Sequence, residues 1–341
     1  MRTRGAGRVG RLLVALIGLG AAGCGPTTPD PCADDDPAIA RVPVELRLTR
    51  LEQPFFQIQR PADALNFINR DPLFARQFLL RRQYPSDSVL ARQLTQLATN
   101  PGLRQLAAET QTIFGDFGPE RAQLRSAFQH VKFYFPDFWV PPVYTFVSGL
   151  SQDVLVTDSV MVLGLDFFAG PKASFRPNVP GYLLRRYQRP HLVPQAVLQI
   201  STKYLKQSFA DRTLLNQMVQ LGKSYYFLDR VLPCTPDSLK IGFTARELAA
   251  TQYNEQKVWA HFLTQKLLYQ TQPNLTQKYI GERPNTAEIG QQAPGRIGAW
   301  VGWQIVRAYM QENPAVTLAQ LLAEEDAQKI LNGSKYKPRK R

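Results

Sequence analysis

The chain has 341 residues, of which 44% are hydrophobic and 20% charged, so it carries enough apolar material for a large folded core. This composition excludes wholesale disorder. Lysine and arginine number 41 against 27 acidic residues, which gives a formal charge of +14. Three cysteines are too few for a disulfide scaffold, and three histidines leave little material for a metal site.

Residues 1–23 predict a lipoprotein signal peptide. An arginine-rich start precedes an apolar run from Leu12 to Leu19, which is much shorter than the ~20 apolar residues of a membrane-spanning helix. The small residues 21–23 stand directly before Cys24 and resemble a bacterial lipobox, in which the cysteine is acylated and becomes the new N-terminus. An ordinary signal peptide followed by an incidental cysteine is the alternative. We expect acyl chains such as palmitate on Cys24 to hold the protein on a membrane.

Residues 24–42 predict a flexible tether, because they are rich in Pro, Asp and Thr and lack apolar periodicity. The acidic run 34–36 indicates a solvated linker rather than a metal site. Cys32 lies in this tether. Export would permit a disulfide between Cys32 and Cys234, but the flexibility expected of the tether disfavours this pairing.

Without residues 1–23 the chain keeps 37 basic and 27 acidic residues, a charge of +10. Export argues against a nucleic-acid partner and favours anionic lipid, cell-wall polymer or an acidic protein surface.

The rest of the chain predicts a small sheet among many helices. From Val44, apolar and polar residues alternate, which is typical of a half-buried strand. Helices are expected over 61–82, 86–113, 119–133, 195–209, 212–230, 244–271 and 297–311, with a last short pair after Thr317, and short strands over 143–147, 154–157 and 160–165. Residues 171–191 indicate a loop. Gly298 and Gly302, four residues apart, predict close approach of another element. Since no interdomain linker is evident, we expect one domain over 43–338.

The familiar catalytic motifs are missing from this sequence. It has no HExxH, GxSxG or P-loop pattern, and His130, His191 and His261 share no ligand spacing. Paired carboxylates could still meet in space, for instance among the set Asp166, Asp229 and Glu255. We therefore expect no catalytic residue, no metal and no cofactor.

Several blocks of sequence together resemble the gliding-motility lipoprotein GldB family. The blocks are LGLDFF at 163–168, GKSYYFLD at 222–229, Asn254-Glu255 with Val258-Trp259, PGRIGAWVGWQIV at 294–306 and SKYKP at 334–338. The resemblance runs from about residue 40 to residue 338. It implies a role in gliding motility and in the associated secretion machinery, with proteins of those machineries as partners.

That family is similar in turn to predicted zinc-dependent proteases of zincin type. The resemblance implies an α+β, predominantly helical fold with a small sheet and a large C-terminal helical part. On this view Gln195 and Gln199 occupy the histidine positions of the active-site helix, Ala196 the glutamate position and Leu221 the third-ligand position. A neutral amide is a poor zinc ligand and alanine is no general base, so the resemblance implies a pseudoenzyme.

The leading expectation is thus a non-catalytic lipoprotein of the bacterial envelope that faces the periplasm. Gly25 is not the acidic residue associated with inner-membrane retention in enteric bacteria, so the outer membrane is favoured over the inner one. Two alternatives stay open. One is an envelope hydrolase with an unrecognised carboxylate or metal site, and the other is a cell-wall glycan-binding module, suggested by the basic charge and the 36 aromatic residues.

Overall fold

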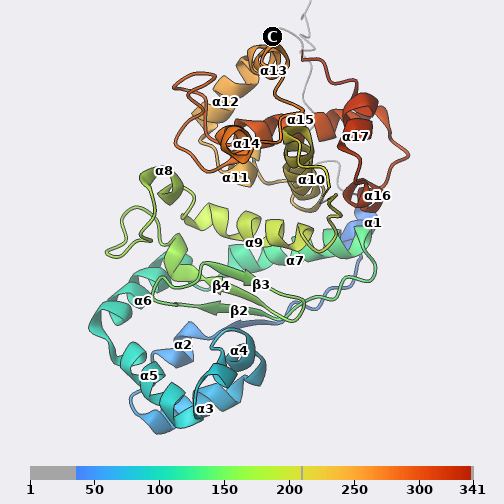
Figure 1. The fold of residues 1–341 in the computed structure, drawn as a ribbon. Helices are drawn as coiled ribbons and strands as arrows, with labels where there is room; N and C mark the ends of the chain where they lie inside the picture. The colour runs from blue at the N-terminus through green and yellow to red at the C-terminus, as the bar shows by residue number, and fades with distance from the viewer. Residues whose placement is uncertain (1–35, 209, 339–341) are drawn as a thin grey trace, which may run out of the picture.

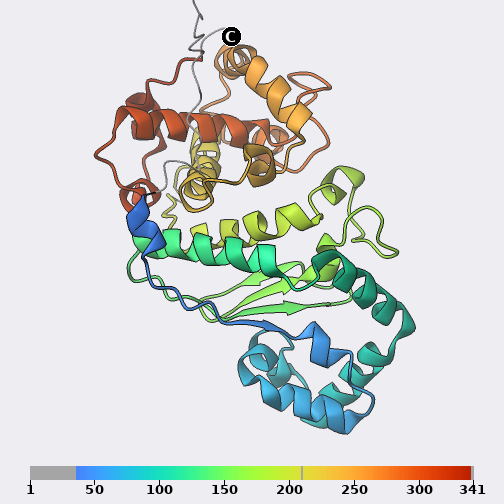
Figure 2. The ribbon, with the colours of Figure 1, turned by 180° about the vertical axis from the view of Figure 1, so that it is seen from behind.

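The computed structural model describes residues 36–208 and 210–338. A small sheet lies in the middle of the molecule, with the helices of residues 52–99 below it and two long helices above it (Figure 1). The remaining helices, from residue 214 onward, form a further layer on top, and the view from behind shows the same order (Figure 2). The fold is therefore α+β and predominantly helical, as the sequence predicts.

In the described part of the chain, the sheet has four short strands in the order β1-β2-β4-β3. They are β1 (Leu48–Arg50), β2 (Val143–Phe146), β3 (Val154–Val156) and β4 (Met161–Gly164). The first three in this order run parallel, and β3 is antiparallel to β4. Every residue of β2 and β4 is buried, as expected for strands covered on both faces. The alternating pattern from Val44 becomes a strand only at Leu48.

The helices below the sheet are shorter than the sequence pattern predicts. They are α2 (Glu52–Phe55), α3 (Pro61–Arg70), α4 (Pro72–Gln77), the 3-10 turn η1 (Arg81–Gln83) and α5 (Asp87–Thr99), and α6 (Pro101–Phe114) continues past the sheet edge. The expected helices 61–82 and 86–113 each break at a proline, because Pro72 and Pro101 disfavour helical backbone in the residue before them. Asp71 and Asn100 then cap the helices that follow, accepting from Phe74 N at 3.1 Å and from Leu103 N at 3.0 Å.

Two helices cover the other face of the sheet. They are α7 (Gly118–Tyr134) and α9 (Leu192–Ser201). Between them the chain passes through β2, β3 and β4 of the sheet and then through three short helices, η2 (Leu165–Phe168), α8 (Gly181–Leu184) and η3 (Arg189–His191). The helix expected over 195–209 therefore starts earlier and ends at Ser201. The short helix α1 (Pro37–Ala40) lies beside α7 and buries Ile39, so the C-terminal end of the predicted tether is packed on the domain.

Between residues 214 and 338, eight helices make up the C-terminal layer. They are α10 (Leu214–Val231), α11 (Asp237–Ile241), α12 (Ala245–Tyr253), α13 (Glu255–Thr264), α14 (Pro273–Ile280), α15 (Ile297–Glu312), α16 (Leu318–Ala323) and α17 (Ala327–Ser334). Capping boxes at Thr244 and Thr317 confirm two predicted starts. The expected helix 244–271 breaks at Asn254, whose side-chain amide donates to the carbonyl of Ala250 at 2.9 Å and ends α12.

The crossing of α10 and α15 depends on two glycines. A Cβ atom on Gly302 would lie 1.8 Å from the carbonyl oxygen of Met218, and one on Gly222 would lie 2.3 Å from the carbonyl oxygen of Gly302. Neither position has room for a side chain, so the two backbones touch. The close approach predicted from Gly298 and Gly302 is confirmed.

Candidate functional site

Three of the predicted degenerate site positions lie on α9, which runs between the sheet and α10 (Figure 1). The amide Nε2 of Gln195 donates to the backbone carbonyl of Arg186 at 2.8 Å. Ala196 is completely buried in the core above the sheet. Gln199 is half-buried. The side chains of Gln195 and Ala196 therefore make structural contacts within the protein and do not face an open site.

Gln199 lines a small hollow of about 210 Å³ at the end of the sheet. Trp139 forms part of its wall with 53% of its surface exposed. An ion pair between Lys203 and Asp158, with Nζ and Oδ1 3.1 Å apart, closes another side. The hollow therefore combines one exposed aromatic ring with charged and amide groups.

Leu221, the predicted third-ligand position, lies on α10 and lines a different hollow of about 630 Å³. The two hollows have no lining residue in common. The structure thus places Gln199 and Leu221 at separate concavities.

The three histidines lie on three different elements of the chain. Nδ1 of His130 is 2.8 Å from the carbonyl of Ser126, and Nε2 of His261 is 3.0 Å from the hydroxyl of Tyr279. His191 is buried, and this burial, with the charges of neighbouring arginines, lowers its pKa. In the described parts of the chain, no three side chains of His, Cys, Asp and Glu gather so that they could hold a metal ion.

The carboxylates that could have met in space have separate partners. Asp166 accepts from the backbone N–H groups of Ser148 at 3.1 Å and Leu150 at 2.6 Å, and burial raises its pKa. Glu255 accepts from the hydroxyl of Tyr336 at 2.8 Å. Asp229 belongs to an ion-pair network on α10, described next. Among the contacts of residues 36–208 and 210–338, no two of these three carboxylates share a partner.

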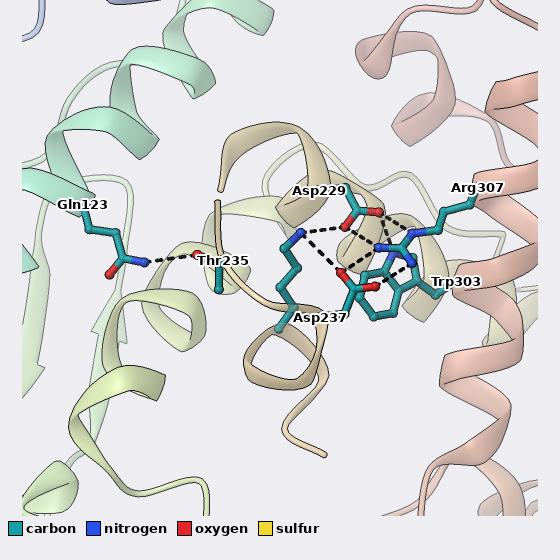
Figure 3. A network of polar contacts seen from close by, with 7 residues as sticks. Gln123, Asp229, Thr235, Asp237, Trp303 and Arg307 are labelled. Carbon is teal, nitrogen blue, oxygen red and sulfur yellow. Dashed lines mark hydrogen bonds and ion pairs between the residues drawn. The ribbon is translucent and has the colours of Figure 1, made fainter. Parts of the chain in front are cut away.

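Asp229 is the centre of a network between α10, α11 and α15 (Figure 3). Arg307 donates to both of its oxygens, from Nε at 2.7 Å and from Nη2 at 2.8 Å, and also makes two hydrogen bonds to Asp237 at 2.7 and 2.9 Å. Lys240 lies 2.9 Å from Asp229, and the indole N–H of Trp303 donates to the same carboxylate at 2.8 Å. The guanidinium carbon of Arg307 lies 3.9 Å from the centre of the Trp303 ring.

The network has no net charge, because two negative side chains, Asp229 and Asp237, face two positive ones, Arg307 and Lys240. Burial by itself would raise the pKa of Asp229, but the hydrogen bonds and charges of Arg307 and Lys240 lower it below its usual value. The carboxylate is therefore ionised and saturated with donors, which suits a structural link better than a reacting group. Sequence reasoning missed this network, although Trp303 and Arg307 lie one turn apart on α15.

A second group of ion pairs ties the loop before α9 to the C-terminal layer. Arg185 pairs with Glu247 at 2.7 Å, and Arg186 pairs with Glu282 at 2.7 Å. Arg296, at the start of α15, also pairs with Glu282 at 3.3 Å. Because Gln195 bonds the backbone of Arg186, this predicted site position is part of the same connection.

Residues 33–338 match the family model described as gliding motility protein GldB. The chain belongs to the GldB family. The resemblance drawn from the sequence is confirmed, and membership implies a role in gliding motility. No curated protein and no solved structure matches the chain, and the relation of this GldB family member to zincin-type proteases stays a prediction.

Two features of this GldB family member concern the envelope. Within residues 36–208 and 210–338, every helix is too short or too polar to cross a membrane. The predicted lipidation site Cys24 lies outside the described residues, as does Cys32.

Cys234 is disulfide-bonded, whereas the sequence disfavoured a disulfide there.

Proposed function

We propose that this GldB family member is an acyl-anchored lipoprotein that supports the gliding machinery and its associated secretion machinery from the periplasmic side of the outer membrane. The family match supports the motility role. The arginine-rich start, the short apolar run and the small residues before Cys24 support the anchor. The partners in this view are proteins of the gliding and secretion machineries.

The protein acts without catalysis, as a degenerate relative of zincin-type proteases. The observation that carries this proposal is the hydrogen bond from Gln195 to the carbonyl of Arg186, because a ligand position of the parent enzymes would then serve as a structural link. The buried methyl group of Ala196 fits the same view, since a general base at that position would have no access to substrate.

Motility of a strain carrying Gln195→Ala with Gln199→Ala tests the non-catalytic proposal. Gene deletion should abolish gliding, the wild-type gene should restore it, and the double variant should glide nearly as well as wild type. Loss of gliding by a double variant with normal abundance and thermal stability would refute the proposal. Stoichiometric zinc in the detergent-extracted protein, measured by elemental analysis, would favour the alternative of a metal hydrolase.

Mass spectrometry of the N-terminal peptide tests the anchor. The wild-type peptide should begin at Cys24 and carry the mass of its acyl groups, and Cys24→Ala should remove that mass. Separation of the membranes by density should place the wild-type protein with the outer membrane. An unmodified Cys24 in the mature protein, or a position in the inner membrane, would contradict this part of the proposal.

The exposed ring of Trp139 favours a second candidate function, the binding of cell-wall glycan. An aromatic face beside the Lys203–Asp158 pair and Gln199 offers a sugar both stacking and hydrogen bonds. Retention on isolated peptidoglycan at moderate salt should then be lost in Trp139→Ala and kept in Tyr253→Ala, whose side chain is exposed elsewhere. Equal retention of the two variants would remove this candidate.

A further inference from the structure

A third hollow, of about 370 Å³, lies beyond the carboxyl end of β4. Asp166 and Phe167, in the 3-10 turn that follows this strand, form one wall, and the loop that carries α8 forms the rest (Figure 1). Ligands of open sheets with helices on both faces bind in the crevice at this end of the parallel strands. The volume also lies within the range of small-ligand sites. Both the position in the fold and the size therefore indicate a binding site.

Much of the wall of this hollow is aromatic or aliphatic. Phe167, Phe175 and Tyr187 contribute rings, and Leu184 adds aliphatic surface. The ring centroids of Phe167 and Tyr187 lie 5.4 Å apart, and the hydroxyl of Tyr187 donates to Asp153 at 3.1 Å, so this side is fixed in place. Phe175 keeps 44% of its surface exposed. A ligand with an apolar body would remove this ring from water, which favours binding.

Several polar side chains in the hollow are already occupied. The carboxylate of Asp166 accepts from two backbone N–H groups of the loop after β2. The amide Nε2 of Gln188 donates to the carbonyl of Arg185 at 3.0 Å, and the guanidinium of Arg185 pairs with Glu247 at 2.7 Å. A sugar, which carries hydroxyl groups around its ring, would therefore find few free groups to bond here.

Arg176 gives the hollow an unmatched positive charge. Its side chain is exposed and, within residues 36–208 and 210–338, forms no hydrogen bond or ion pair. A guanidinium binds a carboxylate through two parallel N–H···O bonds, and this attraction is stronger beside apolar walls than in water. The hollow therefore suits a ligand with one anionic group and an apolar body.

The loop that carries Phe175 and Arg176 is fastened to α6. The backbone N–H and the hydroxyl of Ser174 donate to Glu109 at 2.9 and 2.5 Å, and the amide of Gln105 donates to the same hydroxyl oxygen at 2.9 Å. Because these bonds hold the loop in place before any ligand arrives, little loop ordering opposes binding.

We propose that this hollow binds a small carboxylate with an apolar or aromatic body, which pairs with Arg176 and lies against the three rings. The inference goes beyond the proposed motility role, because it assigns a site and a ligand class that this role does not require. Binding is measured in vitro, so a negative result leaves the anchor and the motility role untouched.

Calorimetric titration of the mature full-length protein in detergent tests the proposal, with the detergent buffer alone as the blank. Three probes separate the charge from the body. Naphthoate carries both, naphthamide has the same body without the charge, and acetate has the charge without the body. Wild type should bind naphthoate at least tenfold more tightly than either of the other two probes.

Three variants locate the site. Arg176→Gln should weaken the binding of naphthoate at least tenfold and leave that of naphthamide unchanged. Arg121→Gln makes the same change at an exposed position on α7 and should alter neither. Gly181 lines the hollow, and a Cβ atom there meets nothing within 4 Å. Gly181→Phe should therefore block both probes while leaving the melting temperature unchanged.

Four results would overturn the proposal. Naphthoate could give no heat above the blank, or naphthamide could bind wild type as tightly as naphthoate, which would show that the charge plays no part. Equal effects of Arg176→Gln and Arg121→Gln would mean that only the overall surface charge attracts the probe. Binding of naphthoate to Gly181→Phe as to wild type would place the probe outside this hollow.

Discussion

Arg307 on α15 and Asp229 on α10 form a two-pronged ion pair, with Nε and Nη2 of the arginine 2.7 and 2.8 Å from the two carboxylate oxygens. The pair joins two helices that already touch through Gly302 and Met218. Charge and backbone packing thus act on the same helix crossing, and each can be tested separately.

Asp229→Ala should lower the free energy of unfolding by ~1–3 kcal/mol, because it removes one of the two carboxylates that Arg307 and the buried Lys240 share and leaves them only Asp237. Urea unfolding followed by circular dichroism measures the change. Glu45→Ala is the matched control, since it removes an acid paired with Arg47 on the exposed surface and should have little effect. Equal effects of the two substitutions would show that the network adds nothing beyond a surface pair.

Gly302→Ala should destabilise the protein by ~1–3 kcal/mol or more, because the new methyl group would overlap the carbonyl of Met218. Thermal unfolding of the purified variant provides the measurement. Gly181→Ala is the control, since a Cβ atom at that position meets nothing within 4 Å. A normal melting temperature for Gly302→Ala would mean that α10 and α15 separate at little cost.

Lys223 should make stability depend on pH in the alkaline range. Its ammonium group is buried and bonded to the backbone carbonyls of Lys206, Leu322 and Glu324, and burial lowers its pKa to about 8. The unfolded chain has the ordinary, higher pKa, so between these two values it binds more protons than the folded chain. The contribution of Lys223 to the free energy of unfolding should therefore rise as the pH rises through this window, and fall as the pH drops to 8.

Urea unfolding at pH 7.5 and pH 10 isolates this effect when wild type is compared with Lys223→Met. Wild type should gain about 2 kcal/mol relative to the variant over that interval, because the interval covers most of the pKa difference and each unit contributes ~1.4 kcal/mol. Lys257→Met, a change at an exposed lysine, should follow wild type at both pH values. A constant difference between wild type and Lys223→Met would show that this lysine titrates normally.

Cys234 should pair with Cys32 in the mature protein. The chain has three cysteines, Cys234 is disulfide-bonded, and acylation would occupy the sulfur of Cys24. Peptide mapping without reductant should recover a cross-linked peptide containing Cys32 and Cys234, and Cys234→Ser should leave Cys32 open to alkylation. A cross-link from Cys234 to Cys24 would contradict both the pairing and the acylation.

Much of the fold follows from short-range pattern in the sequence. The strands at 143–146 and 161–164 appear where β-branched residues cluster, and the capping boxes at Thr244 and Thr317 begin helices as predicted. Gly298 and Gly302 marked the face of α15 that another helix touches. Such signals depend on neighbours within a few residues, so the sequence determines them directly.

The tertiary structure decided what these elements bring together. Asp229 and Arg307 are 78 residues apart, and their contact depends on the angle at which α10 crosses α15. Packing between distant segments likewise places Gln199 and Leu221 at different hollows. It also leaves the buried side-chain oxygen of Gln220 without a hydrogen-bond partner among the described residues. Local pattern fixes which face of a helix is apolar, but only the packed chain fixes which polar groups meet on it.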